Sequence, residues 1–101
     1  MSFRVLWSDS ALERAAELFD FIAEENPAAA KRAIEDLFDR VQALSDHPQL
    51  GRRLSAEIDS SLRRLVIGNY ITIYQVEEES QTVNIVAVRH FRERFLPEEG
   101  A

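Results

Sequence analysis

The sequence predicts an α+β fold in a single domain over residues 1–101, in the order β-α-α-β-β-β, with an antiparallel sheet packed by a helical hairpin. Three observations support this class. Apolar residues recur at helical spacing between residues 10 and 46, and apolar β-formers dominate residues 62–90. A chain of 101 residues that is 46% hydrophobic can bury one core.

The N-terminal third is expected to form a strand and then a helix. Residues 3–7 are a short run of apolar and β-branched residues that suits an opening strand. Ser10 and Glu13 have the spacing of a capping box, in which both side chains satisfy free amides at a helix start. The predicted buried stripe of this helix is Leu12, Ala15, Ala16, Phe19, Ile22 and Ala23.

A second helix is expected to begin at Asn26 and Pro27, because Asn is a good N-cap and Pro fits the first helical position. It should end near residues 46–48, since Pro48 disfavours helical geometry in the residue before it. So short a connection between two helices predicts an antiparallel hairpin. The predicted buried stripe is Ala30, Ile34, Leu37, Phe38, Val41 and Leu44.

The C-terminal half reads as consecutive strands. Residues 49–61 turn polar and are expected to form an irregular connection. Residues 62–67 and 70–76 flank a Gly-Asn pair, which predicts a β-hairpin, and a turn over residues 77–81 leads to a last strand over residues 82–90. Strands linked in this way form an antiparallel sheet, with one face on the helices and the other open.

Composition excludes several classes of protein. No apolar run approaches the roughly 18 residues of a membrane span. The N-terminus lacks the features of a secretion signal, so a cytoplasmic location is expected. Without Cys there are no disulfides or thiolate metal sites, and two His are too few for a His-rich cage, so we expect no metal and no cofactor.

The charge of the chain is unevenly distributed. A net charge of -6 argues against direct binding of nucleic acid by the chain itself. The basic residues of the second half are all Arg, however, and fall in three clusters at Arg52/Arg53, Arg63/Arg64 and Arg89/Arg92/Arg94. Strand alternation places Arg63 with apolar neighbours, which favours a structural anchor whose head pairs with a helix carboxylate.

The ordered set of these motifs resembles the RelE/ParE toxin superfamily over nearly the whole chain. The resemblance rests on residues 21–27, 44–52, 62–76 and 88–94. It implies the toxin of a bacterial type II toxin–antitoxin module, which a small antitoxin holds silent in a hetero-oligomer. RelE-like members cut messenger RNA in the ribosome, whereas ParE-like members poison DNA gyrase without a known hydrolytic step of their own.

The chemistry of RNA cleavage helps to choose between these branches. Attack by a 2′-hydroxyl needs a proton acceptor, a cation beside the phosphate and an acid for the leaving oxygen. RelE-like nucleases usually place an Arg just after the first Tyr of the third strand, where this chain has Ile71. Arg64, His90 and Arg92 could form a partial nuclease site, with His90 as acid or base.

The absence of that Arg favours a ParE-like binding toxin over an enzyme. A RelE-like ribonuclease, or an inactive member that only binds its antitoxin, remains the alternative. Tyr70 and Tyr74 alternate onto one face and are expected to pack or to bind a partner. The residues expected to contact the antitoxin or the target are Arg63, Arg64, Tyr70, Tyr74, Arg89, Arg92 and Arg94.

Overall fold

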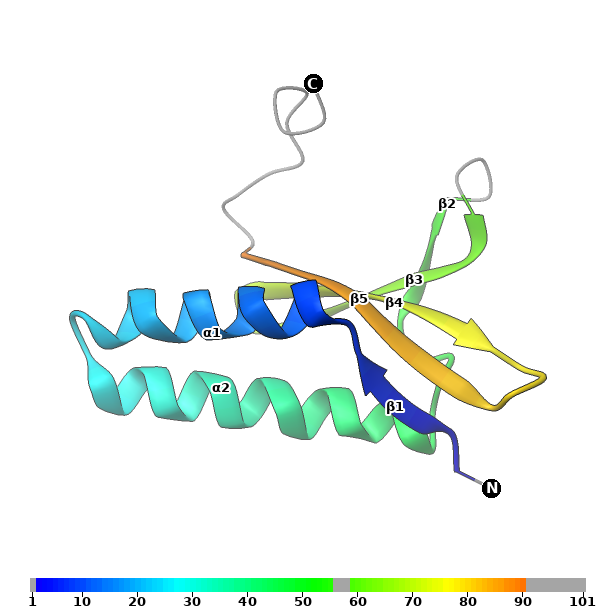
Figure 1. Cartoon of the computed structure of the whole chain (residues 1–101), viewed down its shortest axis with the longest axis horizontal. Coiled ribbons are helices and arrows are strands. Elements are labelled where there is room, and N and C mark those ends of the chain that lie inside the picture. The colour runs from blue at the N-terminus through cyan, green and yellow to red at the C-terminus, as the bar shows by residue number, and fades with distance from the viewer. Residues whose placement is uncertain (1, 56–58, 91–101) are drawn as a thin grey trace.

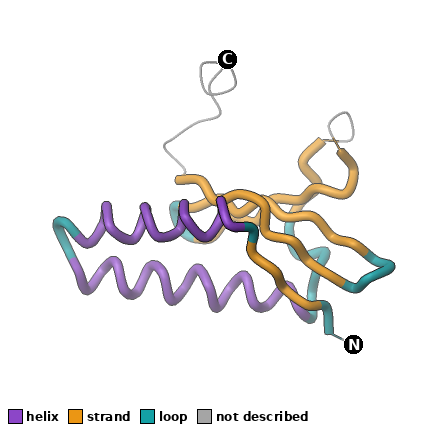
Figure 2. Tube along the Cα trace, in the orientation of Figure 1, coloured by secondary structure: helices purple, strands orange, loops and turns teal. Residues whose placement is uncertain are grey.

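Within residues 2–55 and 59–90, which the computed structural model describes, a helical hairpin packs on one face of a five-stranded sheet (Figure 1). Figure 2 shows the two helices side by side, joined at the end farthest from the N-terminus. The predicted α+β class is confirmed. The elements are β1 (Arg4–Trp7), α1 (Asp9–Ala23), α2 (Pro27–Gln42), a 3-10 turn η1 (Ala43–Ser45), β2 (Arg52–Ser55), β3 (Asp59–Ile67), β4 (Tyr70–Glu77) and β5 (Thr82–His90).

The sheet departs from the prediction in two ways. Its order is β1-β5-β4-β3-β2, and β1 pairs in parallel with β5, so the sheet is mixed rather than wholly antiparallel. The additional strand β2 lies in the segment expected to be irregular, and β3 begins at Asp59. β2 has little apolar pattern of its own, and it is extended because it pairs with β3. Hydrophobic periodicity in the sequence does not reveal such pairing.

Side-chain caps start both helices. Asn26 caps α2 as predicted, because its side chain accepts a hydrogen bond from the Ala29 amide at 3.0 Å and Pro27 follows it. α1 begins two residues earlier than the spacing of Ser10 and Glu13 predicts. Ser8, directly after β1, accepts a hydrogen bond from the Ala11 amide at 3.1 Å and is the N-cap.

The buried face of α1 also differs from the predicted stripe. Ala11, Ala15 and Leu18 are buried, whereas Leu12 is 44% exposed. Ala side chains on this face allow the helix backbone to come close to β5, against which α1 packs. The contact between α1 and β5 is therefore made largely by Ala side chains, which contribute little to a hydrophobic pattern.

The stripe of α2 is largely confirmed. Ala30, Leu37 and Val41 are buried, and Leu44 in η1 continues the row. Phe38 is the exception, because it remains 38% exposed at the rim of the core. Its ring packs against Trp7 of β1, with the ring centroids 4.6 Å apart.

The segment between α2 and β2 is fixed to the sheet by a buried tyrosine. The Tyr74 hydroxyl donates a hydrogen bond to the carbonyl of Pro48 at 2.9 Å and accepts one from the Gly51 amide at 2.7 Å. Arg63 donates to the Gly51 carbonyl at 2.7 Å. Arg63 is thus an anchor, as predicted, but it holds a loop carbonyl instead of a helix carboxylate.

Gly51 is required at this position by close packing. A Cβ added there would clash with the backbone carbonyl of Arg64 and would lie 2.7 Å from the Tyr74 hydroxyl oxygen. The loop therefore approaches β3 and β4 more closely than any other residue type would allow.

Among the described residues, no helix combines the length and apolar character needed to cross a bilayer.

Substitutions on α2 should separate the core from its rim. We expect Leu37→Ala to lower the free energy of unfolding by about 2–5 kcal/mol, because it leaves a cavity. Phe38→Ala should cost less, about 1–2 kcal/mol, because its ring is partly exposed. Asp39→Ala, on the exposed side, should cost under about 0.5 kcal/mol. Urea unfolding midpoints test this order, and equal shifts for all three variants would show that the helix register is wrong.

Tyr74 should make stability depend on pH in the alkaline range. Burial raises the pKa of its hydroxyl above the ordinary 10.0, while the hydrogen bond from Gly51 and the charge of Arg63 act in the opposite direction. Above about pH 10 the unfolded chain loses this proton first. The stability contribution is therefore complete below pH 10 and is lost as pH rises through the folded-state pKa.

Tyr74→Phe is expected to reduce that alkaline loss and to cost about 1–3 kcal/mol at neutral pH, because the buried Gly51 amide and the half-buried Pro48 carbonyl lose their partner. Denaturant unfolding of both proteins between pH 8 and 11 measures the two effects. Tyr70→Phe is the matched control, since burial also raises the Tyr70 pKa but no hydrogen bond links its hydroxyl to that loop. Identical pH profiles for wild type and Tyr74→Phe would contradict the assignment.

Candidate functional site

The two faces of the sheet carry different groups. Residues directly opposite each other in an antiparallel ladder share a face. Arg64 lies opposite Ile73, and Ile71 lies between Val66 on β3 and Arg89 on β5. These rows face away from the helices and form what we call the open face.

His90 lies on the other side of the sheet. It pairs with Tyr70, which in turn pairs with the buried Ile67, so this row faces the helices. The rings of Tyr70 and His90 meet edge to face, with centroids 5.4 Å apart. The structure therefore places Arg64 and His90 on opposite faces of the sheet and does not bring them into one site.

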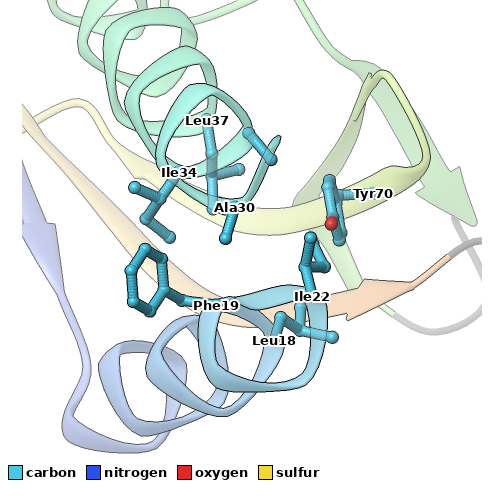
Figure 3. Close-up of a pocket in the computed structure, with 8 residues that line it drawn as sticks. Leu18, Phe19, Ile22, Ala30, Ile34, Leu37 and Tyr70 are labelled. Atoms are coloured by element: carbon cyan, nitrogen blue, oxygen red, sulfur yellow. The ribbon is translucent and has the colours of Figure 1, made fainter. Parts of the chain in front are cut away.

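A groove of about 370 Å³ lies beside His90, between the helices and the turn at Gly68 and Asn69. Within residues 2–55 and 59–90, its polar lining comes from Asp36, Asn69, Tyr70 and His90. Figure 3 shows the adjoining apolar pocket, where the Tyr70 ring lies against Ile22 of α1. Burial raises the pKa of the Tyr70 hydroxyl. Among the described residues, the groove therefore offers a neutral phenol, an amide, a histidine and a carboxylate, and neither Lys nor Arg to hold a phosphate.

The open face combines exposed apolar groups with arginine. Leu6 on β1 is 45% exposed and Val66 on β3 is 52% exposed. Arg64, on the same strand as Val66, is also exposed, and Arg89 is half-buried on the same face. Such a surface suits a partner with an apolar stripe flanked by acidic side chains.

The other predicted binding residues have different outcomes. Tyr74 is fully buried, so its place among residues that contact a partner is corrected to a structural one. Arg63 is turned toward the Gly51 carbonyl. Arg92 and Arg94 lie outside the described residues.

The structure adds Arg52 and Arg53, which were seen as a cluster but not assigned to a site. β2 places Arg52 opposite Arg64 and Arg53 opposite Arg63. Two Arg-Arg pairs on either side of a polar stretch are the signal that could have indicated this hairpin. The pairing concentrates positive charge at one edge of an acidic protein.

Comparison with known proteins identifies the family. A protein of Sinorhizobium fredii described as "Putative toxin Y4kP" is 32% identical over 94 residues, which cover 91% of this chain and 92% of that protein. The fold is shared with the chromosomal ParDE toxin–antitoxin system of P. aeruginosa, at 16% identity and a TM-score of 0.74, covering 88% of this chain and 96% of the other.

The RelBE2 toxin–antitoxin complex of Mycobacterium tuberculosis also shares the fold, at 23% identity and a TM-score of 0.65, with 89% of this chain and 99% of the other covered. Residues 5–95 match the family described as the ParE toxin of the type II toxin–antitoxin system parDE. The match spans both helices and every described strand except the first residue of β1. The chain therefore belongs to the ParE toxin family, within the RelE/ParE superfamily that its motifs resemble.

Proposed function

We propose that this toxin acts by binding DNA gyrase and is neutralised by a cognate antitoxin, without cleaving RNA. The observation that carries this proposal is the separation of Arg64 from His90 by the sheet. A phosphodiester bound at one face cannot be reached by a proton donor on the other, because the strand backbones lie between them. A cation and an acid must act on the same phosphate to cleave it.

Ile71 supports the same proposal. It is an aliphatic side chain, only 6% exposed, at the position where RelE-like nucleases usually carry an Arg. Its neighbours across the strands are Val66 and Arg89. A hydrocarbon at this position gives no charge to stabilise the transition state of phosphate chemistry.

The electrostatics of the whole chain point in the same direction. At a net charge of -6, long-range repulsion opposes approach to the phosphate-rich ribosome. Contact with a protein target does not require the chain to approach a phosphate-rich surface. An exposed face with apolar groups and Arg64 can contact a protein directly.

The antitoxin is proposed to cover the open face. Leu6 and Val66 offer exposed apolar surface to an amphipathic tail, and Arg64 offers a guanidinium to its carboxylates. Two solved structures with this fold come from toxin–antitoxin systems, and one of them is described as a toxin–antitoxin complex. We expect the same kind of pairing here.

The first test compares the two targets. The purified chain should inhibit supercoiling by gyrase and leave messenger RNA intact in a translation assay. His90→Gln should change the inhibition by less than about twofold, because that side chain is not used for hydrolysis. Cleavage of messenger RNA that disappears in His90→Gln would instead assign the RelE-like ribonuclease, and inactivity in both assays would assign the inactive alternative.

The second test concerns the antitoxin. Coexpression with the neighbouring gene should give a soluble complex, and Arg64→Glu should weaken it at least tenfold, about 1.4 kcal/mol, by calorimetry. Arg32→Glu is the matched control, because it makes the same charge change at an exposed position on α2. A greater loss with Arg32→Glu would move the interface to the helices.

A further inference from the structure

The free edge of β2 is the feature that the proposed function leaves unused. β2 is the last strand in the sheet order, so no described strand pairs with its outer side. In Figure 1 β2 lies away from both helices, whereas the far end of β3, at Ile67, is packed in the core. An exposed edge presents unpaired amide and carbonyl groups to any strand that can approach.

The side chains of this edge select the partner by charge. Arg52 lies opposite Arg64 on the open face, and Arg53 lies opposite Arg63 on the other. Like charges directly opposite each other destabilise a sheet. Arg63 is held by the Gly51 carbonyl, whereas Arg52, Arg53 and Arg64 have no ion pair with any described residue.

We propose that the edge of β2 is a strand-addition site for an extended acidic segment of the neutralising partner. The incoming backbone extends the sheet by one strand through main-chain hydrogen bonds. Successive side chains of a strand point to opposite faces, so two consecutive carboxylates meet the Arg pairs on both faces at once. Arginine binds carboxylates through paired hydrogen bonds, and this contact relieves the repulsion within each pair.

Two other occupants fit less well. A second copy of the chain, paired edge to edge, would bring two more arginines to each crowded row, which adds repulsion. A nucleic acid could bind the arginines of one face, but its backbone has no amide to pair with the carbonyls of β2. Only an acidic peptide matches both the charges and the hydrogen-bonding edge.

A synthetic peptide tests the site in the full-length chain. The probe is a capped peptide of alternating Val and Thr around one Glu-Glu pair. We expect it to shift the NMR signals of the β2 amides and to slow their hydrogen exchange at least tenfold at saturation. The same peptide methylated on alternate backbone nitrogens keeps its charge but loses its donors, and it should bind at least tenfold more weakly. A Lys-Lys version should not bind.

Paired variants separate the edge from general charge. Arg52→Glu with Arg53→Glu should weaken binding of the Glu-Glu peptide at least tenfold. Lys31→Glu with Arg32→Glu, an equal charge change on α2, should change it less than about twofold. Circular dichroism checks that each variant folds. If the Glu variant does not fold, Arg52→Gln with Arg53→Gln, which only removes charge, gives the same comparison.

Each contrary outcome overturns the inference. Equal binding of the methylated peptide would show attraction without strand pairing. Protection of the same amides by an oligonucleotide alone, or by self-association of the chain, would assign the edge to another occupant. The inference rests on the proposed neutralising partner but not on gyrase. A failure of the peptide assay would therefore count against the β2 edge as a binding site, and a failure of the supercoiling assay would count against gyrase as the target.

Discussion

The hydroxyl of Tyr74 joins the helical layer to the sheet where the chain passes from one to the other. Its hydrogen bonds with Pro48 and Gly51 fix the loop after α2 against β3 and β4. Because the loop leads directly into β2, the position of the sheet edge depends on this contact. The arginine rows at that edge are thus aligned by this buried, neutral contact together with the hydrogen bond that Arg63 donates to the Gly51 carbonyl.

The sheet also divides the polar groups of the protein into two chemically different environments. The open face holds guanidinium groups beside aliphatic side chains, and the helix-facing side holds Tyr70 and His90 beside an apolar pocket. A single layer of strands is enough to keep them apart, because alternate residues point in opposite directions. Arg64 and His90 are therefore held on opposite sides of the strand backbones.

The sequence predicted those parts of the fold that local chemistry determines. Asn26 and Pro27 marked the start of α2, and Gly68 with Asn69 marked a hairpin, where Gly68 has the positive φ of 58° that a tight turn uses. β2 was missed because pairing with β3, not its own residues, makes it a strand. The site could be predicted only as a set of residue types. The sheet face on which Arg64 or His90 lies depends on the register in which the strands pair, and the sequence alone does not reveal that register.

β1 and β5 meet in parallel although they stand at opposite ends of the described chain. Bringing such distant segments together carries a large loop-closure entropy and slows folding. The α1–α2 hairpin can form early from local contacts, but Val5 and Trp7 cannot take their places until β5 has been made. On the ribosome, a nascent chain of this family is therefore an incomplete sheet. Among the described strands, the pairing of β1 requires that β5 has emerged.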